Sequence, residues 1–400
     1  MLSVKIQLRY MKQQKIFIDG LGLVEGHFSG VGQYILGILR GLDTLLDEAK
    51  YRGEPVPDVR VVIPRGTTAK FRTFGFKHIG CKRLPTSFRY TAALWHRGWM
   101  PPIDLFCGRG TYIFPRFVSM PLLFSKNAGL VIFDLSYELH RQYSDEGNAL
   151  FLSHAVKKSI GKTQKIIAIS QNARQEIIDF YKLPASRVVV ATPATDKSVM
   201  YRRNPEEVER VKHRYGIKGS YILALSNLEP RKNLDMLVDA YCELPDRLRK
   251  QYKLLLVGVS GWKTDKLFNK IVEKVDQGYE IVRPSDYVSD EDKAAIISGA
   301  AMLVYPSHYE GFGMPPLEAL ACGVPIITAD NSSLPEVVGK AGVMVSSDNK
   351  KRLVEAMVDY LDDLDKVTAK ATKQGPAQAA TFSWEKSAQV FLDVAKESAS

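Results

Sequence analysis

Short β-branched runs alternate with longer segments of helical period along most of this sequence. Between residues 30 and 41, for example, the apolar residues Val31, Ile35, Ile38 and Leu39 follow the helical repeat. The alternation is typical of parallel α/β units, because a parallel strand pair needs a crossover connection, usually a helix. We expect strands at residues 15–19, 59–63, 103–107, 130–133, 165–169, 188–191, 221–225, 253–257, 281–283, 302–305, 325–328 and 342–345.

The two halves of the chain each contain a complete set of such units, so we predict two domains. The total of 400 residues agrees with two domains of ordinary size. A turn-prone stretch at residues 193–205 indicates the seam, which gives domains at residues 1–198 and 199–383. We expect the Gly/Pro/Ala-rich residues 375–377 to interrupt the chain before a last helix, residues 384–400, which can pack back on the first domain.

The net charge of +11 lies entirely in the first half of the chain. Residues 1–200 hold 28 basic and 15 acidic side chains, and no acidic residue stands between Asp58 and Asp104. Such asymmetry predicts a polyanionic partner, namely a membrane surface, a phosphorylated substrate or nucleic acid. Aromatic residues interleave with the basic ones here, which favours an anionic membrane surface; the alternative is a solvated face above core aromatics. The predicted membrane patch is Lys70, Arg72, Lys77, Lys82 and Arg83.

Other features narrow the class of protein. No stretch approaches the 18–20 apolar residues, roughly, that a membrane-spanning helix needs, and the N-terminus lacks the apolar core of a signal peptide. The four cysteines are scattered, with neither the density of a disulfide framework nor a metal-ligand spacing. We therefore expect a protein of the reducing cytosol that binds no metal.

The most informative motif is residues 308–318, HYEGFGMPPLE, which follows an expected strand and leads into a helix. Glycines after a strand leave backbone N–H groups uncovered, and a helix N-terminus adds partial positive charge, so this turn suits a diphosphate. Two carboxylates bracket the turn. Glu318 falls in the first turns of the helix, within reach of a ribose hydroxyl pair, while Glu310 lies in the loop.

This motif and its continuation to residue 342 resemble the signature of the family 4 retaining nucleotide-sugar glycosyltransferases. A second match, residues 225–234 (LSNLEPRKNL), is similar to the phosphate-binding loop of that family. The resemblance extends from about residue 15 to residue 384. It implies the α/β fold called GT-B, in which two Rossmann-like, doubly wound domains face each other across a deep cleft. The C-terminal domain would hold the nucleotide-sugar donor and the N-terminal domain the acceptor.

The resemblance also implies roles for single residues. Arg231 and Lys232 would neutralise the donor diphosphate in place of a divalent metal. Glu310 would contact the transferred sugar, either as nucleophile or as electrostatic stabiliser. Many members carry an arginine where Asn227 stands, which makes Arg231 the stronger phosphate partner. The implied donor-binding residues are Asn227, Val288, Gly311, Phe312, Gly313, Met314, Pro315 and Glu318.

The motifs of the first half are weaker. Gly30, Val31 and Gly32 form a Gly-x-Gly turn, which can close over phosphates or an acceptor or be only a tight turn. Asp134 ends an expected strand and is the fourth predicted catalytic residue. Family members often show His-Asp at this point, whereas Phe133 precedes Asp134 here, and His140 is a candidate substitute.

Together these observations predict a retaining, metal-independent glycosyltransferase without a cofactor. The donor would be a nucleotide-diphosphate hexose, with GDP-mannose favoured and a UDP-sugar as the other choice. The acceptor would be a glycan, lipid-linked, in surface polysaccharide or O-antigen synthesis. We expect a cytoplasmic protein at the inner face of the plasma membrane and no nucleic-acid partner. Two alternatives stay open: a GT-B-fold nucleotide-sugar epimerase or phosphorylase, and a non-catalytic protein that binds glycan or nucleic acid.

Overall fold

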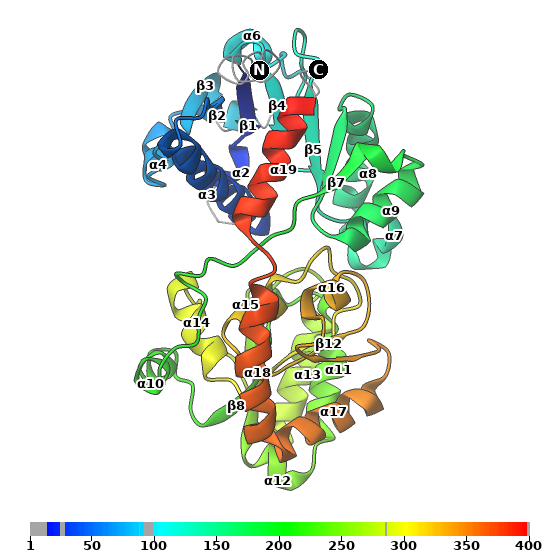
Figure 1. Ribbon diagram of the computed structural model, residues 1–400. Helices are drawn as coiled ribbons and strands as arrows, with labels where there is room; N and C mark the ends of the chain where they lie inside the picture. The colour runs from blue at the N-terminus through cyan, green and yellow to red at the C-terminus, as the bar shows by residue number, and fades with distance from the viewer. Residues whose placement is uncertain are drawn as a thin grey trace. The chain divides into compact units, whose positions relative to one another are not determined.

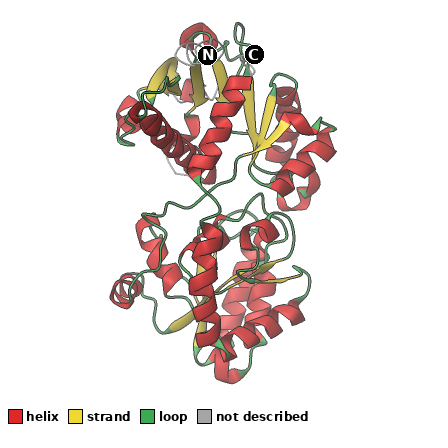
Figure 2. Ribbon diagram, viewed as in Figure 1, coloured by secondary structure: helices red, strands yellow, loops and turns green. Residues whose placement is uncertain are grey.

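The computed structural model describes residues 14–24, 29–87, 89–91, 94, 99–284 and 286–397. The chain divides into two compact units, which we describe separately (Figure 1). The N-terminal unit comprises Met1–Leu139, Glu146–Pro193 and Ser383–Ser400, and the C-terminal unit comprises His140–Asp145 and Ala194–Phe382. In both units short strands alternate with helices (Figure 2).

The N-terminal unit contains a seven-stranded sheet of order β3-β2-β1-β4-β5-β6-β7, and all its strand pairs are parallel. The order reverses between β1 and β4. The strands are β1 (Lys15–Asp19), β2 (Asp58–Arg65), β3 (Gly80–Ser87), β4 (Thr111–Phe114), β5 (Ala128–Ile132), β6 (Lys165–Ala168) and β7 (Val188–Val190). The helices are α2 (Leu21–Val24), α3 (Gly30–Tyr51), α4 (Thr68–Arg72), α6 (Asp104–Cys107), α7 (Ser136–Leu139), α8 (Glu146–Ile160), α9 (Gln171–Tyr181) and α19 (Trp384–Glu397), with the 3₁₀ turn η2 (Ala185–Arg187).

One expected strand of this unit was wrong. Residues 104–107 form helix α6 with Ile103 as its N-cap, and the strand beside β1 is instead β4. The carboxylate of Asp104 accepts hydrogen bonds from the backbone N–H groups of Leu123, Phe124 and Ser125 at 2.7–3.1 Å. These three hydrogen bonds from a distant loop hold Asp104 at the start of the helix. Local periodicity in the sequence does not reveal such a long-range interaction.

The C-terminal helix α19 belongs to the N-terminal unit, where it packs on α3. Two glycines of α3 make room for it. A Cβ at Gly37 would lie 2.3 Å from the indole ring of Trp384, and a Cβ at Gly41 would lie 2.4 Å from the Trp384 carbonyl oxygen. The hydroxyl of Tyr34, also on α3, donates to the Ala191 carbonyl at 3.0 Å. The close approach of the two helices therefore depends on the absence of side chains at two positions one turn apart.

Gly41→Ala is expected to destabilise the protein although alanine is the better helix former. Helix propensity favours alanine by about 1 kcal/mol, but overpacking against backbone costs roughly 1–3 kcal/mol. The free energy of unfolding in urea should fall accordingly. Gly30→Ala is the control, because Gly30 lies in the first turn of the same helix with nothing within 4 Å of its Cβ position. Equal stability of the Gly41→Ala variant and the wild type would contradict this account of the packing.

The C-terminal unit contains a six-stranded parallel sheet of order β10-β9-β8-β11-β12-β13, which reverses between β8 and β11. The strands are β8 (Ser220–Leu225), β9 (Tyr252–Val257), β10 (Ile281–Val282), β11 (Met302–Tyr305), β12 (Ile326–Ala329) and β13 (Val343–Val345). The helices are α10 (Pro205–Arg214), α11 (Leu234–Cys242), α12 (Asp246–Arg249), α13 (Asp265–Asp276), α14 (Asp290–Ser298), α15 (Met314–Ala321), α16 (Leu334–Val338), α17 (Lys350–Asp362) and α18 (Leu364–Ala379), with the 3₁₀ turns η1 (Arg141–Tyr143) and η3 (Pro230–Lys232).

The expected break at residues 375–377 was also wrong, because α18 continues through Pro376 to Ala379. Gly375 packs against α15, where a Cβ would lie 2.6 Å from the Leu320 carbonyl oxygen. The glycine serves close helix packing, and the chain leaves the helix only afterwards. The predicted parallel α/β class is nevertheless confirmed in both units. In the described part of the chain, no helix is both long and apolar enough to cross a bilayer.

Candidate active site

The candidate site of the C-terminal unit lies where the strand order of its sheet reverses. Loops that leave the carboxyl ends of β8 and β11 start next to each other, because these strands pair in parallel. Ligands of open α/β sheets bind in the crevice at such a point. The first loop carries residues 226–233 and the second residues 306–313, which are the two motifs singled out in the sequence.

The loop after β8 is held in a fixed shape by Asn233. This residue adopts a left-handed conformation, with φ of 55°, between η3 and the start of α11. Its side-chain amide donates to the carbonyls of Pro306 at 3.1 Å and Ser347 at 2.8 Å. The backbone N–H of His308 in turn donates to the Arg231 carbonyl at 2.9 Å. The two loops are therefore joined by direct hydrogen bonds.

The loop after β11 is braced from its other side by two serines that precede α16. The Ser332 hydroxyl accepts a hydrogen bond from the Glu310 N–H at 2.9 Å. The Ser333 hydroxyl donates to the carbonyls of Glu310 at 2.9 Å and Phe312 at 2.6 Å. Gly313, with φ of 114°, turns the chain into α15 in a conformation that side chains disfavour. These contacts fix the backbone on both sides of Glu310.

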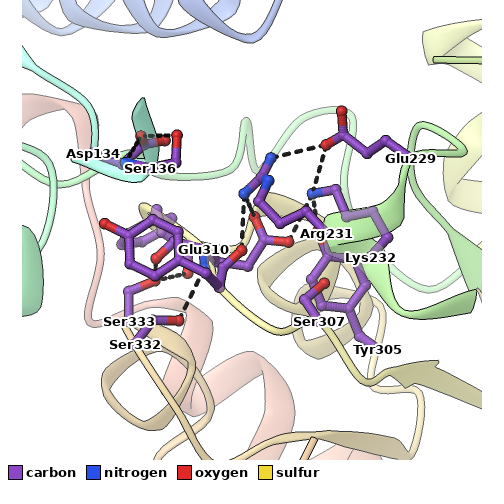
Figure 3. A network of polar contacts seen from close by, with 12 residues as sticks. Asp134, Ser136, Glu229, Arg231, Lys232, Tyr305, Ser307, Glu310, Ser332 and Ser333 are labelled. Carbon is purple, nitrogen blue, oxygen red and sulfur yellow. Dashed lines mark hydrogen bonds and ion pairs between the residues drawn. The ribbon is translucent and has the colours of Figure 1, made fainter. Parts of the chain in front are cut away.

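Glu310 lies between two cations, as Figure 3 shows. Its Oε1 accepts from the Lys232 ammonium at 2.7 Å, and its Oε2 accepts from the Arg231 guanidinium at 3.0 Å. The carboxylate side chain is only 7% exposed and the lysine side chain 10% exposed. The structure thus unites three of the four predicted catalytic residues in one buried ion cluster.

Two further members of the cluster were not predicted from the sequence. Glu229 accepts a hydrogen bond from the second guanidinium nitrogen of Arg231 at 3.0 Å, and the hydroxyl of Tyr305 accepts one from Lys232 at 2.9 Å. Glu229 could have been identified from the sequence, since a carboxylate two positions before an Arg-Lys pair suggests a salt bridge with those cations. Tyr305 appeared only as an apolar strand residue.

Electrostatics within the cluster favour an ionised Glu310. Burial acts to raise the pKa of Glu310, but the charges of Arg231 and Lys232 outweigh it and lower the pKa from 4.5 to about 2. Burial also lowers the pKa of Lys232 from its usual value, while the charge of Glu310 opposes that shift. Glu310 is consequently an anion and a very weak base at neutral pH.

Some of the predicted donor-binding residues lie on α15, which directly follows the loop that carries Glu310. Glu318 is buried and its carboxylate accepts a hydrogen bond from Lys293 on α14 at 2.7 Å. The ring of Phe312 contacts that of Phe382 at a centroid distance of 5.4 Å. Among the described residues, no protein group accepts a hydrogen bond from the N–H of Phe312 or Gly313. These two N–H groups remain available for an anion.

The other predicted residues have varied surroundings. Gly311 is buried, Met314 and Pro315 are half-buried at the start of α15, and Val288 is buried just before α14. Asn227 is exposed after β8 and takes no part in the ion cluster.

Asp134 and the glycine motif belong to the N-terminal unit. The Asp134 carboxylate accepts hydrogen bonds from the N–H and hydroxyl of Ser136 at 2.9 and 2.7 Å. Gly30, Val31 and Gly32 form the first turn of α3, where the Ser29 hydroxyl accepts from the Gly32 N–H. The motif is therefore the capped start of a helix.

His140, the candidate substitute for the missing histidine, groups with the C-terminal unit. Its ring lies 4.4 Å from that of Tyr309, next to Glu310 in the chain. The ring of Tyr143 stacks on His308 at 5.2 Å, and the two planes differ by 5°. Residues 140–145 thus pack against the same loop that carries Glu310.

Comparison with known proteins agrees with this geometry. Residues 206–377 match the family model described as "Glycosyl transferases group 1". The matched segment, which is less than half of the chain, is similar to a group 1 glycosyltransferase domain. The domain includes all five members of the ion cluster, as well as Glu318 and Lys293.

The similar proteins include two mannosyltransferases of Escherichia coli. O-antigen chain mannosyltransferase B is 35% identical over 253 residues, which cover 63% of this chain and 65% of that protein. Serotype-specific mannosyltransferase WbdA is 28% identical over 237 residues, which cover 58% of this chain and 28% of that protein. The chain thus matches less than two thirds of the length of either relative.

Solved structures resemble the chain over nearly all of its length. WaaG, a glycosyltransferase involved in lipopolysaccharide biosynthesis, has a TM-score of 0.67 at 16% identity and covers 95% of this chain and 99% of its own. Anabaena HepE in complex with UDP and glucose has a TM-score of 0.66 at 15% identity, with 95% and 98% covered. This likeness confirms the predicted GT-B fold class of two Rossmann-like domains.

Proposed function

We propose that this chain is a retaining glycosyltransferase that moves a hexose from a nucleotide-diphosphate sugar to a glycan acceptor. The observation that carries the proposal is that Glu310 accepts hydrogen bonds from both Lys232 and Arg231. This contact lies where the strand order of the C-terminal sheet reverses. A buried lysine and a partly buried arginine, beside two N–H groups without a protein acceptor and a helix N-terminus, suit the diphosphate of a donor.

In the reaction, the bond between the anomeric carbon and the phosphate oxygen breaks, and the acceptor hydroxyl oxygen bonds to that carbon. Arg231 and Lys232 stabilise the negative charge that develops on the departing diphosphate, which is the task a divalent metal performs elsewhere. The acceptor proton passes to the departing phosphate oxygen when attack occurs on the same face. No metal or cofactor is needed for these steps.

Glu310 acts in this mechanism as a stabiliser of positive charge on the sugar. Double displacement would require a carboxylate nucleophile on the far face of the anomeric carbon. Both oxygens of Glu310 are engaged by cations, and a pKa of about 2 makes its carboxylate a weak nucleophile. These properties support same-face attack within a loose ion pair.

The likeness to two E. coli mannosyltransferases, one of them an O-antigen chain mannosyltransferase, supports mannose as the transferred hexose, and we propose GDP-mannose as the donor. HepE, whose fold is similar, is in complex with UDP and glucose, which keeps a UDP-sugar as the alternative donor. The acceptor we propose is a lipid-linked oligosaccharide of surface polysaccharide or O-antigen synthesis. The reaction would take place at the cytoplasmic face of the membrane.

A thermal-shift screen of GDP, UDP and their sugars tests the donor proposal directly. A ligand that binds only the folded state raises the melting temperature by mass action. We expect stabilisation by GDP and GDP-mannose, followed by transfer of mannose in the presence of a lipid-linked acceptor. Stabilisation by no nucleotide would overturn the proposed function. Turnover of the nucleotide sugar in the absence of acceptor would indicate an epimerase instead.

We also propose that basic residues of the N-terminal unit bind an anionic membrane. Lys82 and Arg83 are exposed on β3, at the edge of the sheet. Lys77 forms a salt bridge with Asp47 at 3.5 Å, and Lys70 and Arg72 lie on α4. Phe71 is buried and packs with the half-buried Phe74 and Phe76, so these rings are core aromatics, as the alternative interpretation of this stretch expects.

Exposed apolar side chains lie instead on α6 and on the loop that Asp104 holds. Leu105 and Leu123 are 50% and 60% exposed, and Phe106 and Phe124 are 38% and 48% exposed. Lys82 is close enough to α6 to lower the pKa of Cys107 electrostatically, although burial raises that pKa overall. Apolar side chains beside basic ones are typical of surfaces that bind anionic lipid.

Replacing Lys82 and Arg83 with glutamine is expected to weaken binding to anionic vesicles roughly 30-fold, because each basic group near such a surface contributes about 1 kcal/mol. Sedimentation with phosphatidylglycerol vesicles measures the effect. Lys366→Gln with Lys370→Gln, on α18 of the other unit, is the charge-matched control. Nucleotide binding should be unchanged in both double variants. If the two double variants bound vesicles equally well, Lys82 and Arg83 would have no role in membrane binding.

A further inference from the structure

A salt bridge between α14 and α15 connects two residues of the C-terminal unit that are 25 positions apart. The Lys293 ammonium donates to Oε1 of Glu318 at 2.7 Å, and Asp290 lies 3.5 Å from the same lysine. The Glu318 side chain is 8% exposed and that of Lys293 is 22% exposed. No other described residue forms a hydrogen bond with the Glu318 carboxylate. One carboxylate oxygen is therefore engaged by the lysine.

A buried carboxylate without a cation beside it becomes protonated. Burial raises the pKa of Glu318 above its ordinary value, while the charge of Lys293 acts to lower it. Asp290 adds to the upward shift, and the thiol of Cys322 is the further titratable group coupled to Glu318. The lysine stays charged, because Glu318 raises its pKa in spite of burial. Lys293 is thus the group that opposes protonation of Glu318.

The protonation state of Glu318 matters for a sugar ligand. An ionised carboxylate accepts hydrogen bonds from both hydroxyls of a ribose, whereas a protonated one has lost part of that capacity and its charge. The lysine also restricts the rotamer of Glu318, because a 2.7 Å contact leaves the side chain little freedom. Charge and orientation would both change when the lysine is removed.

We infer that Lys293 is a positioning residue that keeps Glu318 oriented and ionised to accept the ribose hydroxyls of the donor nucleotide. The inference rests on the proposed function, since it assumes that a nucleotide binds at this loop. It extends that function to the selection of ribonucleotides over nucleotides that lack the 2′ and 3′ hydroxyls. The competing explanation is that the salt bridge only clamps α14 to α15.

The test compares the dissociation constants of GDP and UDP with those of their 2′,3′-dideoxy counterparts, measured by titration calorimetry. We expect the wild type to prefer the ribonucleotide about 10- to 100-fold, the value of one or two charge-assisted hydrogen bonds. Lys293→Met should lose most of this preference, and Lys293→Arg should retain it. Lys270→Met is the matched control, because Lys270 is 23% exposed and donates to Asp239 at 2.8 Å in the same unit.

A pH series separates positioning from clamping. In Lys293→Met the pKa of Glu318 rises further, so the preference for the ribonucleotide should return as the pH increases and Glu318 ionises. A clamp would give weaker binding of both nucleotides with no such pH dependence. Lys293→Met/Glu318→Gln removes the unpaired buried charge and should fold, with the preference lost at every pH.

The outcomes are distinguishable. Failure of both GDP and UDP to bind the wild type would overturn the proposed function itself. Binding by the wild type with no ribose preference, or an undiminished preference in Lys293→Met, would overturn the role of Lys293 and leave the proposed function standing.

Discussion

Lys232→Met is expected to lower kcat/KM for sugar transfer about 10²–10³-fold, the usual cost of removing one preorganised group that stabilises developing charge. The loss should appear in both kcat and KM, since the ammonium would meet the diphosphate in the ground state as well as in the transition state. Steady-state transfer from GDP-mannose or the UDP-sugar that binds measures the effect.

Lys212→Met is the control for loss of a buried lysine. The Lys212 side chain is 11% exposed, compared with 10% for Lys232, and it pairs with Glu209 on α10 of the same unit. We expect its transfer rate to remain close to that of the wild type. If the two variants transferred sugar equally fast, Lys232 would not belong to the catalytic machinery.

Glu310→Gln is expected to reduce kcat about 10²–10³-fold while nucleotide binding is kept. The isosteric amide removes the charge that would stabilise the sugar, but it frees Arg231 and Lys232 for the diphosphate. The same change removes one of the two carboxylates that pair with Arg231 and Lys232 and leaves Glu229 as their remaining anion. We expect a loss of folding stability of up to about 3–5 kcal/mol, the usual cost of breaking a buried ion pair. Nucleoside diphosphate should therefore raise the melting temperature of Glu310→Gln by more than that of the wild type.

The double variant Lys232→Met/Glu310→Gln provides the cross-check. Residues in one ion-pair network are coupled, so its loss of stability should be smaller than the sum of the two single losses. Additive losses would mean that the contact at 2.7 Å contributes no coupling energy. A Glu310→Gln enzyme with an unchanged kcat would exclude the proposed role of the carboxylate.

The sequence was sufficient to predict the parallel α/β class and the core of the site. The class depends on local signals, namely strand and helix periods, whereas the site depends on glycine-rich turns after strands together with the resemblance of two motifs to family 4 glycosyltransferases. Arg231, Lys232 and Glu310 could be identified because each lies in a motif at the end of a strand. Their mutual contacts then follow from the parallel pairing of β8 with β11.

The errors came from interactions between distant parts of the chain. Asp104 begins a helix because loop residues about 20 positions away donate to it, and Gly375 serves a helix contact instead of a break. Lys293 stands in an acidic, helix-starting run that suggests an exposed face, and only the fold brings it to Glu318. Such long-range pairings leave no periodic trace in the sequence.

The division of the chain has a practical consequence for protein engineering. A chimera that exchanges the N-terminal unit with a single junction at residue 194 would keep α19 from the original protein. Trp384 would then meet a foreign α3, and any side chain at the positions of Gly37 and Gly41 would exclude it. Working hybrids should need a further junction near residue 383, so that α3 and α19 are inherited together, and an explicit choice of parent for residues 140–145.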